Sequence, residues 1–276
     1  MILFAHILEQ SLLFFPLALG IFLSYRILRC TDLTVDGSFV LGAAVFARVA
    51  VAGSGAIIAQ LAALGAGAAA GFVASMVQRR IQPLLAGILV LFVLHSFNLQ
   101  VMGRANISLL GLDRLPHNLI ALSILGVSLI FAIFMLLRSR AGLLLRAFGN
   151  NPKLIKQQGY SQNLLRSSGL MLSNALVASC GAFTAQANGY ADVQMGFGMV
   201  MIGIGTVVLG QRCVVRFFQP QRFCPLLELF GCAIGTLLYF TTLHFFLALG
   251  VDPLYLKMLI GVSLIGFMMS AEDSYV

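Results

Sequence analysis

The sequence predicts an all-α polytopic membrane protein with about nine transmembrane helices, within a range of eight to ten. Two observations predict this class. The 276 residues are 60% hydrophobic and only 9% charged, whereas soluble domains carry about 25% charged residues. The apolar residues also form long runs, and a hydrocarbon core needs roughly 20 such residues for each helical crossing. Little chain is left for a soluble domain, so we expect one transmembrane domain over residues 1–276.

Nine apolar runs mark the expected crossings. The first run should remain as a membrane helix, because residues 1–8 lack the basic residues of a secretory signal. The seventh run is short enough for a half-helix or a re-entrant segment, which leaves the count open. The runs lie at 10–28, 37–53, 56–77, 84–103, 118–137, 164–187, 195–210, 225–248 and 254–271.

Basic residues predict the orientation of these crossings. Most of the 17 Lys and Arg lie in three connections, residues 78–80, 138–166 and 212–222, which alternate crossings place on one side. Cytoplasmic loops collect Lys and Arg, so this side should be cytoplasmic and the C-terminal residues 271–276 should lie there. The same bias explains the net charge of +8. We therefore expect a lipid bilayer and no nucleic acid as the chain's surroundings.

Several catalytic signatures are missing from the sequence. It has no G-x-x-x-x-G-K-[ST] phosphate loop and no H-E-x-x-H zinc motif. The five cysteines show no Cys-x-x-Cys spacing, so they predict neither a disulfide framework nor a metal site. Gly53-Ser54-Gly55 has no evident base beside it. We expect a protein that is not an enzyme and that binds no cofactor itself.

The basic connection over about residues 138–163 is amphipathic and predicts a short cytoplasmic helix. Asn151 can cap this helix, Pro152 suits its first turn, and Gly159 can end it in a left-handed conformation. A short helix between two membrane helices can dock into a groove on another protein. An interfacial helix that touches only lipid headgroups is the alternative.

A polar stretch between the first two apolar runs places Asp32 and Asp36 next to the membrane. Carboxylates at membrane depth need partners or water, and Arg26 and Arg29 are close enough in sequence to provide them. Asp36 could also cap the second helix. Both a structural charge cluster at the membrane surface and a direct role in conduction remain open.

Four further polar residues lie inside predicted crossings. Arg48 falls in the second crossing, where it either snorkels to the outer headgroups or lines a polar pathway. His95, Asn98 and Gln100 lie in the outer half of the fourth. Such groups are costly against lipid, so they should face the bundle, either in a translocation path or in hydrogen bonds between helices.

Several longer motifs carry a resemblance to a known family. Together they resemble permease subunits of ATP-binding-cassette importers, in the group of branched-chain amino-acid and ribose permeases, closest to the tryptophan/tyrosine transport permeases. The likeness runs from about residue 12 to 265. The motifs are Asp32-Leu-Thr-Val-Asp-Gly-Ser-Phe39 with Leu41-Gly-Ala-Ala44, Pro83-Leu-Leu-Ala-Gly-Ile-Leu89, Asn98-Leu-Gln-Val-Met-Gly103, Gly149-Asn-Asn-Pro152, Leu172-Ser-Asn-Ala175, Asn188-Gly-Tyr-Ala-Asp-Val193 and Met195-Gly-Phe-Gly198.

The resemblance implies a function shared between subunits. Two copies of this chain would form a homodimer in a bacterial inner membrane and act with two cassette ATPases, which bind ATP and Mg, and an extracytoplasmic binding protein. The solute would be small, an amino acid and aromatic by analogy, and would cross by alternating access. The cytoplasmic loop would be the coupling helix. The residues expected to couple to the ATPase are Gly149, Asn150, Asn151, Pro152, Lys153 and Gly159.

The sequence departs from the family pattern at two places, which bear on the identity of the solute more than on the fold or mechanism. Cys30-Thr31 stands where the family suggests an aromatic residue and a proline, and Gln211 replaces an expected acidic residue.

The alternative function is a secondary transporter or channel that works without ATP. Such a protein would favour inverted repeats and broken helices around a midplane site, and the sequence shows no convincing internal repeat.

Overall fold

A computed structural model describes residues 2–109, 119–218 and 224–269. Within these ranges each of the nine predicted runs coincides with a helix, which confirms the all-α fold. The helices are α1 Ile2–Ile21, α2 Val35–Val51, α3 Ala56–Val77, α4 Pro83–Met102, α5 Leu119–Arg138, α8 Gln162–Asn188, α9 Met199–Phe218, α10 Pro225–Ala248 and α11 Pro253–Met269. The seventh run was predicted too short, because α9 continues past Gly210 through Arg212 and Arg216.

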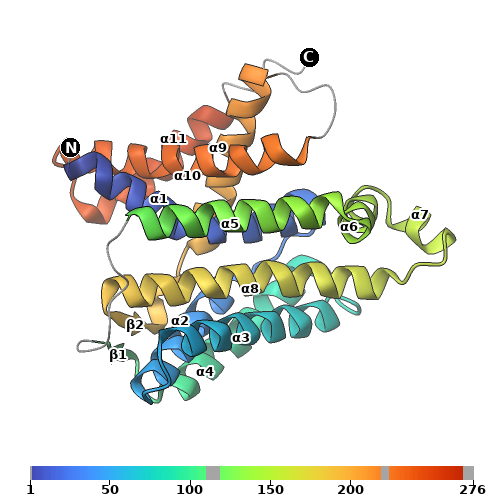
Figure 1. The fold of residues 1–276 in the computed structure, drawn as a ribbon, viewed down its shortest axis with the longest axis horizontal. Coiled ribbons are helices and arrows are strands. Elements are labelled where there is room, and N and C mark those ends of the chain that lie inside the picture. Colours follow the sequence, from blue (N-terminus) through green and yellow to red (C-terminus); the bar gives the residue numbers. More distant parts are fainter. Residues whose placement is uncertain (1, 110–118, 219–223, 270–276) are drawn as a thin grey trace.

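Shorter elements connect these helices. A π-helical turn, η1 (Phe22–Ile27), extends α1, and a 3-10 turn, η2 (Val193–Gly196), precedes α9. Strand β1 (Asn106–Ser108) pairs antiparallel with β2 (Tyr190–Asp192). Helices α6 (Arg140–Asn150) and α7 (Pro152–Gln157) lie at the opposite end of the molecule (Figure 1). We call these two ends the hairpin end and the α7 end.

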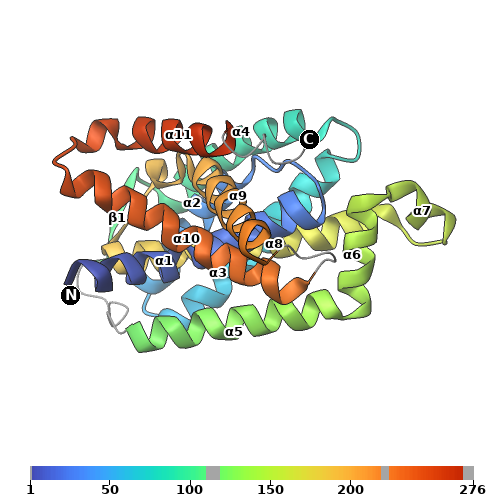
Figure 2. The same cartoon turned by 90° about the horizontal axis from the view of Figure 1, so that it is seen from above.

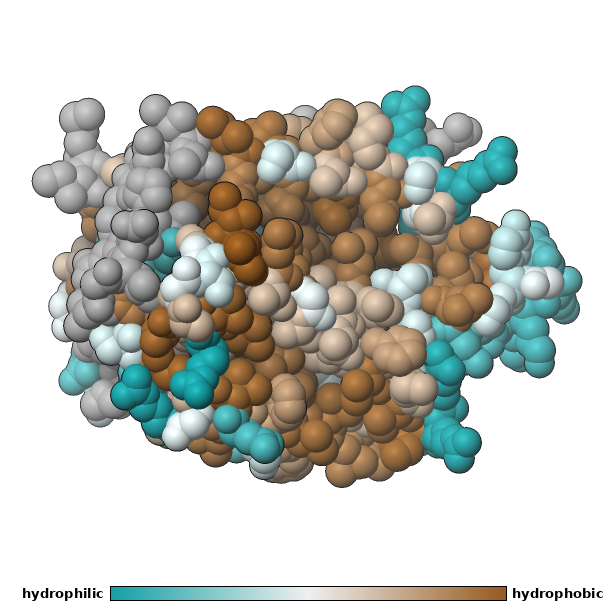
Figure 3. Space-filling model, turned by 60° about the horizontal axis from the view of Figure 1, so that its bottom comes forward, coloured by the Kyte–Doolittle hydropathy of each residue, from teal (hydrophilic) through white to brown (hydrophobic). Residues whose placement is uncertain are grey.

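The length and apolarity of the helices suit a membrane. Six candidate spans are present among the described residues, or seven if α5 and α6, which are bent by 73° relative to each other, count as one. Figure 3 shows a broad apolar surface between the two ends, with hydrophilic residues gathered at the α7 end. The six spans are Leu3–Ile27, Ala56–Val77, Pro83–Met102, Gln162–Asn188, Val193–Phe217 and Pro225–Ala248.

Helix α8 is the central element, and α1, α2 and α3 all pack against it. Glycine allows the closest of these approaches. A Cβ added at Gly42 of α2 would lie 1.9 Å from the carbonyl oxygen of Ala178, and one added at Gly181 of α8 would lie 2.0 Å from that of Phe39. Small residues let membrane helices approach where the hydrophobic effect cannot drive association. The start of α2 is thereby fixed against α8.

Two series of four helices, α1–α4 and α8–α11, follow the same plan. Each begins with a long helix, continues through a segment without α-helix (22–34 or 189–198) and resumes with a helix whose first turn contains a buried residue, Val35 or Val200. The third helix of each series packs on the first helix of the other, α3 on α8 and α10 on α1. Because α1 runs toward the α7 end and α8 runs away from it (Figure 1), the two series have opposite directions. The sequence showed no internal repeat that would have predicted these two opposed series.

Candidate functional site

Asp36 joins the starts of the two interrupted helices. It lies in the first turn of α2, but its carboxylate accepts hydrogen bonds from the backbone amides at the start of α9, Gly198 N at 3.2 Å and Val200 N at 2.7 Å. The first amides of a helix lack partners within it and carry partial positive charge. Asp36 therefore caps α9, whereas the sequence suggested that it could cap α2.

This junction lies deep in the molecule. Gly37, the neighbour of Asp36, packs against Leu91 and Leu94 near the middle of α4. Its carbonyl oxygen accepts a hydrogen bond of 3.0 Å from Asn98 Nδ2. Helix α4 is one of the candidate spans, so Asp36 lies beside the middle of a candidate span rather than beside one of its ends.

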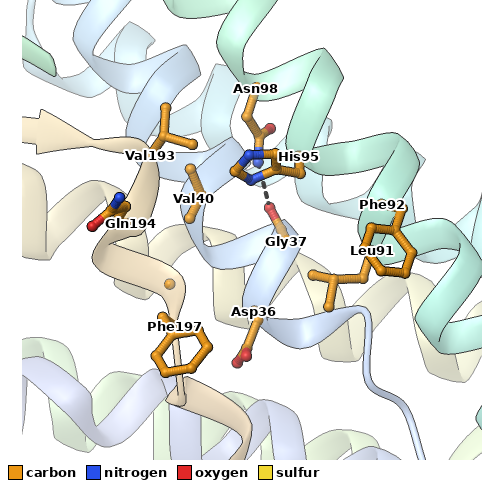
Figure 4. A pocket seen from close by; sticks show the side chains of 11 residues that line it. Asp36, Gly37, Val40, Leu91, Phe92, His95, Asn98, Val193, Gln194 and Phe197 are labelled. Atoms are coloured by element: carbon orange, nitrogen blue, oxygen red, sulfur yellow. Dashed lines mark hydrogen bonds between the residues drawn. The ribbon is translucent and has the colours of Figure 1, made fainter. Parts of the chain in front are cut away.

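A cavity of about 630 Å³ opens beside this junction. It brings together three of the predicted pathway residues, Asp36, His95 and Asn98 (Figure 4). A second cavity of about 620 Å³ shares Asp36, Leu91 and Phe197 with the first and is lined mainly by apolar side chains of α9, α10 and α11. The shared residues show that the two cavities adjoin, and Figure 2 shows α9 running obliquely across the helices beside it. The complete lining of the first cavity is Asp36, Gly37, Val40, Leu91, Phe92, His95, Asn98, Val193, Gln194, Gly196 and Phe197.

The other predicted pathway residues lie elsewhere. Arg48 is exposed in the last turn of α2 and Gln100 is exposed on α4. Asp32 is buried at 6% exposure, where it accepts hydrogen bonds from Thr34 N at 3.0 Å and Asn174 Nδ2 at 2.8 Å. None of these three is among the residues that line the described cavities.

The partners of Arg26 and Asp32 differ from the expected pairing of arginines with Asp32. Arg26 lies 3.5 Å from Glu228 at the start of α10, and Asp32 is held by amide and hydroxyl groups. The sequence did not indicate the roles of Asn174 and Phe197, which it presents only as members of longer motifs. The glycines on either side of Phe197 are the signal that could have indicated an interrupted backbone there. Among the described residues no three His, Cys, Asp or Glu side chains gather as metal ligands.

The short helix predicted at the α7 end is confirmed. Asn151 Oδ1 accepts a hydrogen bond of 3.2 Å from Leu154 N, Pro152 is the first residue of α7, and Gly159 has a φ of +82°. Helix α6 was not anticipated. It contains Gly149, where a Cβ would lie 2.0 Å from the carbonyl oxygen of Ile27. Gly149 thus packs inward, and Asn150 is exposed.

Polar contacts connect the α7 end with the segment that leads to Asp36. The Arg166 guanidinium lies 5.8 Å from the centre of the Phe148 ring of α6 and donates a hydrogen bond of 3.0 Å to the carbonyl oxygen of Gln78. The Gln78 side chain in turn accepts a hydrogen bond of 3.2 Å from the Cys30 thiol. Burial is the main cause that raises the pKa of this thiol to about 11, and the nearby Asp32 carboxylate raises it further.

The motifs and this geometry agree with what is known of other proteins. A family model described as branched-chain amino acid transport system / permease component matches residues 3–268. The chain belongs to this permease family. The tyrosine transport system permease protein of Clostridioides difficile is 31% identical over 268 residues, which cover 95% of this permease and 89% of that protein. An uncharacterized protein of Rickettsia prowazekii is 44% identical over 265 residues, 93% of each chain. No solved structure matches the permease.

Family membership defines the general role of the permease. It is a multi-pass membrane component of an amino-acid transport system and not its catalytic subunit, so it binds no cofactor of its own. A permease component of this kind works with an ATPase and a binding protein. Within the described residues, the Asp36 junction brings polar groups and a cavity together beside the middle of α4.

Proposed function

We propose that the permease is the membrane subunit of an ATP-driven importer that moves an amino acid with an aromatic side chain across the bacterial inner membrane. The family match supports the transport role. The Clostridioides difficile relative, whose name specifies tyrosine, supports the choice of solute. Transport would proceed by alternating access, in which the cavity at Asp36 opens first toward the hairpin end and then toward the α7 end.

The observation that carries this proposal is the exposed α7 end. Helix α7 projects beyond the bundle (Figure 1). Its Ile155 is fully buried, whereas Lys153, Leu154 and Lys156 are exposed. Two cations around an apolar side chain suit a groove on a protein partner. We infer that this end is cytoplasmic and docks on the ATPase, with Asn151, Pro152 and Gly159 shaping α7 and Gly149 and Asn150 joining it to α6.

The contacts of Arg166 offer a route for coupling. A movement of α6 would displace the Phe148 ring and the Arg166 guanidinium, which holds the end of α3 through Gln78. Gln78 contacts Cys30, six residues before Asp36. Rigid helices joined by such contacts can transmit a shift between two discrete arrangements.

A second copy of the chain would complete the path. Phe92 and Phe197 at the cavity are 68% and 77% exposed, so the cavity opens on an outer face of the bundle. In a single copy this face would bring Asp36 and His95 toward lipid, and polar groups at membrane depth are costly there. We therefore propose a homodimer whose two cavities face each other.

Charge reversal at the α7 end tests the coupling. The permease is expressed with the ATPase of its own transport system, and Lys153→Glu with Leu154→Asp should abolish copurification of the ATPase and lower ATP-dependent uptake at least tenfold. Arg104→Glu, an exposed residue at the hairpin end, is the matched control and should retain the ATPase. Full retention of the ATPase by the α7 variant would disprove the docking proposal.

The opposed four-helix series favour a second candidate function. Repeats of opposite direction with helices broken at the midplane are typical of transporters that use ion gradients, and α2 and α9 both start at the Asp36 junction. Uptake by permease alone in ATP-free proteoliposomes, driven by a sodium or proton gradient, would establish this candidate and overturn the importer. Uptake that requires ATP and the ATPase would exclude it.

A further inference from the structure

We infer that the second cavity, between α9, α10 and α11, receives the aromatic ring of the solute, and that the Tyr239 hydroxyl selects rings that carry a hydrogen-bonding group. This inference rests on the proposed transport function and names the residue that determines the choice among aromatic solutes. The charged end of the amino acid stays in the first cavity, whose lining contains more polar side chains.

The second cavity is apolar apart from two side chains. Most of its lining belongs to α9, and only Asp36 and Tyr239 among the described lining residues have polar side chains. The Asp36 carboxylate already accepts two backbone amide hydrogen bonds from α9. Apolar walls with a few placed polar groups are typical of small-molecule sites, and the volume of about 620 Å³ lies in their usual range. Tyr239 is therefore the side chain that can give this cavity its specificity.

The Tyr239 hydroxyl lacks a partner inside the protein. Tyr239 is only 5% exposed, and no hydrogen bond joins its hydroxyl to another described residue. Its ring packs edge to face on Phe240, with 5.4 Å between the ring centres, which holds the side chain in place. Buried polar groups are normally paired, and a phenol can both donate and accept. Lipid tails offer no such partner, so the unpaired hydroxyl indicates a polar group that arrives with the solute.

The boundary between the two cavities suits an aromatic ring. Phe197 and Leu91 line both cavities, and Figure 4 shows them on opposite sides of the space beside Asp36. Aromatic rings pack favourably against each other in offset or edge-to-face arrangements. An amino acid that lies along Phe197 can thus place its ring in the second cavity while its charged end remains in the first.

The Tyr239 hydroxyl then distinguishes between aromatic rings. The phenol of tyrosine can pair with it, whereas phenylalanine leaves it unpaired. A site that hydrogen-bonds a polar group of its ligand rejects the analogue without that group, because the buried group of the site is left without a partner. The second cavity therefore favours tyrosine over phenylalanine.

Binding to the permease alone tests the role of Tyr239 without ATP. Permease in lipid nanodiscs is titrated with L-tyrosine and L-phenylalanine, which differ by one hydroxyl, and saturation-transfer NMR reads their ring protons. The unchanged permease should bind tyrosine about fivefold more tightly, the usual effect of one hydrogen bond. In Tyr239→Phe this preference should disappear, because tyrosine binding weakens while phenylalanine binding is kept. Tyr255→Phe, at an exposed position of α11 outside the cavity lining, is the control and should keep the preference.

A cavity-filling variant locates the ring independently. Gly261 of α11 lines the second cavity, and nothing lies within 4 Å of a Cβ added there. Gly261→Leu should keep the unfolding temperature of the unchanged permease, occupy the space and weaken binding of both amino acids at least tenfold. Gly266→Leu is the matched control, because its Cβ also meets nothing within 4 Å in the same helix but Gly266 does not line the cavity. This control should bind both amino acids normally.

The outcomes separate this inference from the proposed function. Absent tyrosine binding, equal affinity for the two amino acids, or a preference that persists in Tyr239→Phe would overturn the role of Tyr239 even if ATP-dependent uptake is intact. Normal binding by Gly261→Leu would overturn the placement of the ring. A preference for tyrosine that depends on Tyr239, in a permease that never associates with an ATPase, would support the site and overturn the importer.

Discussion

Asp32 and Asp36 lie four residues apart in one polar segment, yet their surroundings differ. Asp32 is buried, and its carboxylate is held by Thr34 and Asn174. Asp36 is partly buried, caps α9 and faces a cavity. The first carboxylate fastens the segment to α8, and the second lines a cavity. Two acids of one sequence motif can thus lie in a closed and in an open environment.

The difference follows from where each helix begins. The segment 28–34 is irregular, and irregular backbone at membrane depth is tolerated when protein surrounds it or when it lines a cavity. Asp32 belongs to the surrounded part. Asp36 belongs to the first turn of α2, where the start of α9 approaches and the bundle leaves space.

The largest effect on stability is expected for Asp32→Asn. The new amide would place a donor against Asn174 Nδ2, and Asn174 cannot turn to compensate because it also donates to the Leu170 carbonyl oxygen. A buried unpaired group of this kind costs about 3 kcal/mol. Unfolding of purified permease in mixed micelles measures the loss.

A double-mutant cycle provides the control for Asp32. Asn174→Ala removes the same contact from the other side, so the combined variant should be destabilised by less than the sum of the two single variants. Additive losses would show that Asp32 and Asn174 act independently and would remove the structural role from Asp32.

The sequence predicted the positions of the helices better than the contacts of the two carboxylates. Apolar runs located nine helices because each crossing needs an uninterrupted apolar length. The basic loop located α7 because Asn151, Pro152 and Gly159 have local effects on the backbone. The partners of Asp32 and Asp36 depend on contacts with residues 174, 198 and 200, more than a hundred positions away, and no local pattern encodes them. The C-terminal residues 271–276, placed in the cytoplasm from sequence, lie outside the described residues.

The next largest effect is expected where α2 meets α8. Gly42→Ala would place a Cβ 1.9 Å from the Ala178 carbonyl oxygen, so the two helices must separate. Overpacking of this kind lowers the free energy of unfolding by about 2 kcal/mol. It would also displace α2, which carries Asp36, and α8, which holds Asp32. Loss of stability together with loss of uptake, measured on the same preparation, is the expected result.

Gly65→Ala is the matched control for Gly42. Nothing lies within 4 Å of a Cβ added at Gly65, which is also in a helix interior. Alanine has the higher helix propensity, so this variant should keep or raise stability, by up to about 1 kcal/mol. An equal loss in both variants would show that close contact of α2 with α8 is not the cause.

A smaller effect on stability is expected for Asp36→Asn. Asparagine keeps one oxygen that can cap α9, and a lost cap costs about 1 kcal/mol. Uptake by the complete complex should nevertheless fall at least tenfold, because the charge at the cavity is gone. Comparing unfolding with uptake for Asp32→Asn and Asp36→Asn sharpens the division of roles. If Asp36→Asn loses as much stability as Asp32→Asn, the proposed division of roles between the two carboxylates is wrong.

The last prediction changes the fold least, because it uses chemical labelling of the Cys30 thiol. The labelling rate reports whether the region around Asp32 is closed to solvent. Burial raises the pKa of this thiol from 9.0 to about 11, and the thiolate is the form that reacts with maleimide. At pH 8 its thiolate fraction should be about a hundredfold below that of an ordinary thiol, and labelling should accelerate as the pH rises toward 11. A permease in which the other four cysteines are replaced by alanine allows the rate to be followed by mass spectrometry. Asp36→Asn should leave the labelling rate of Cys30 unchanged, since Asp36 is not a cause of the raised pKa of this thiol. Faster labelling in that variant would show that the regions around Asp32 and Asp36 open together. The two carboxylates would then not lie in separate environments.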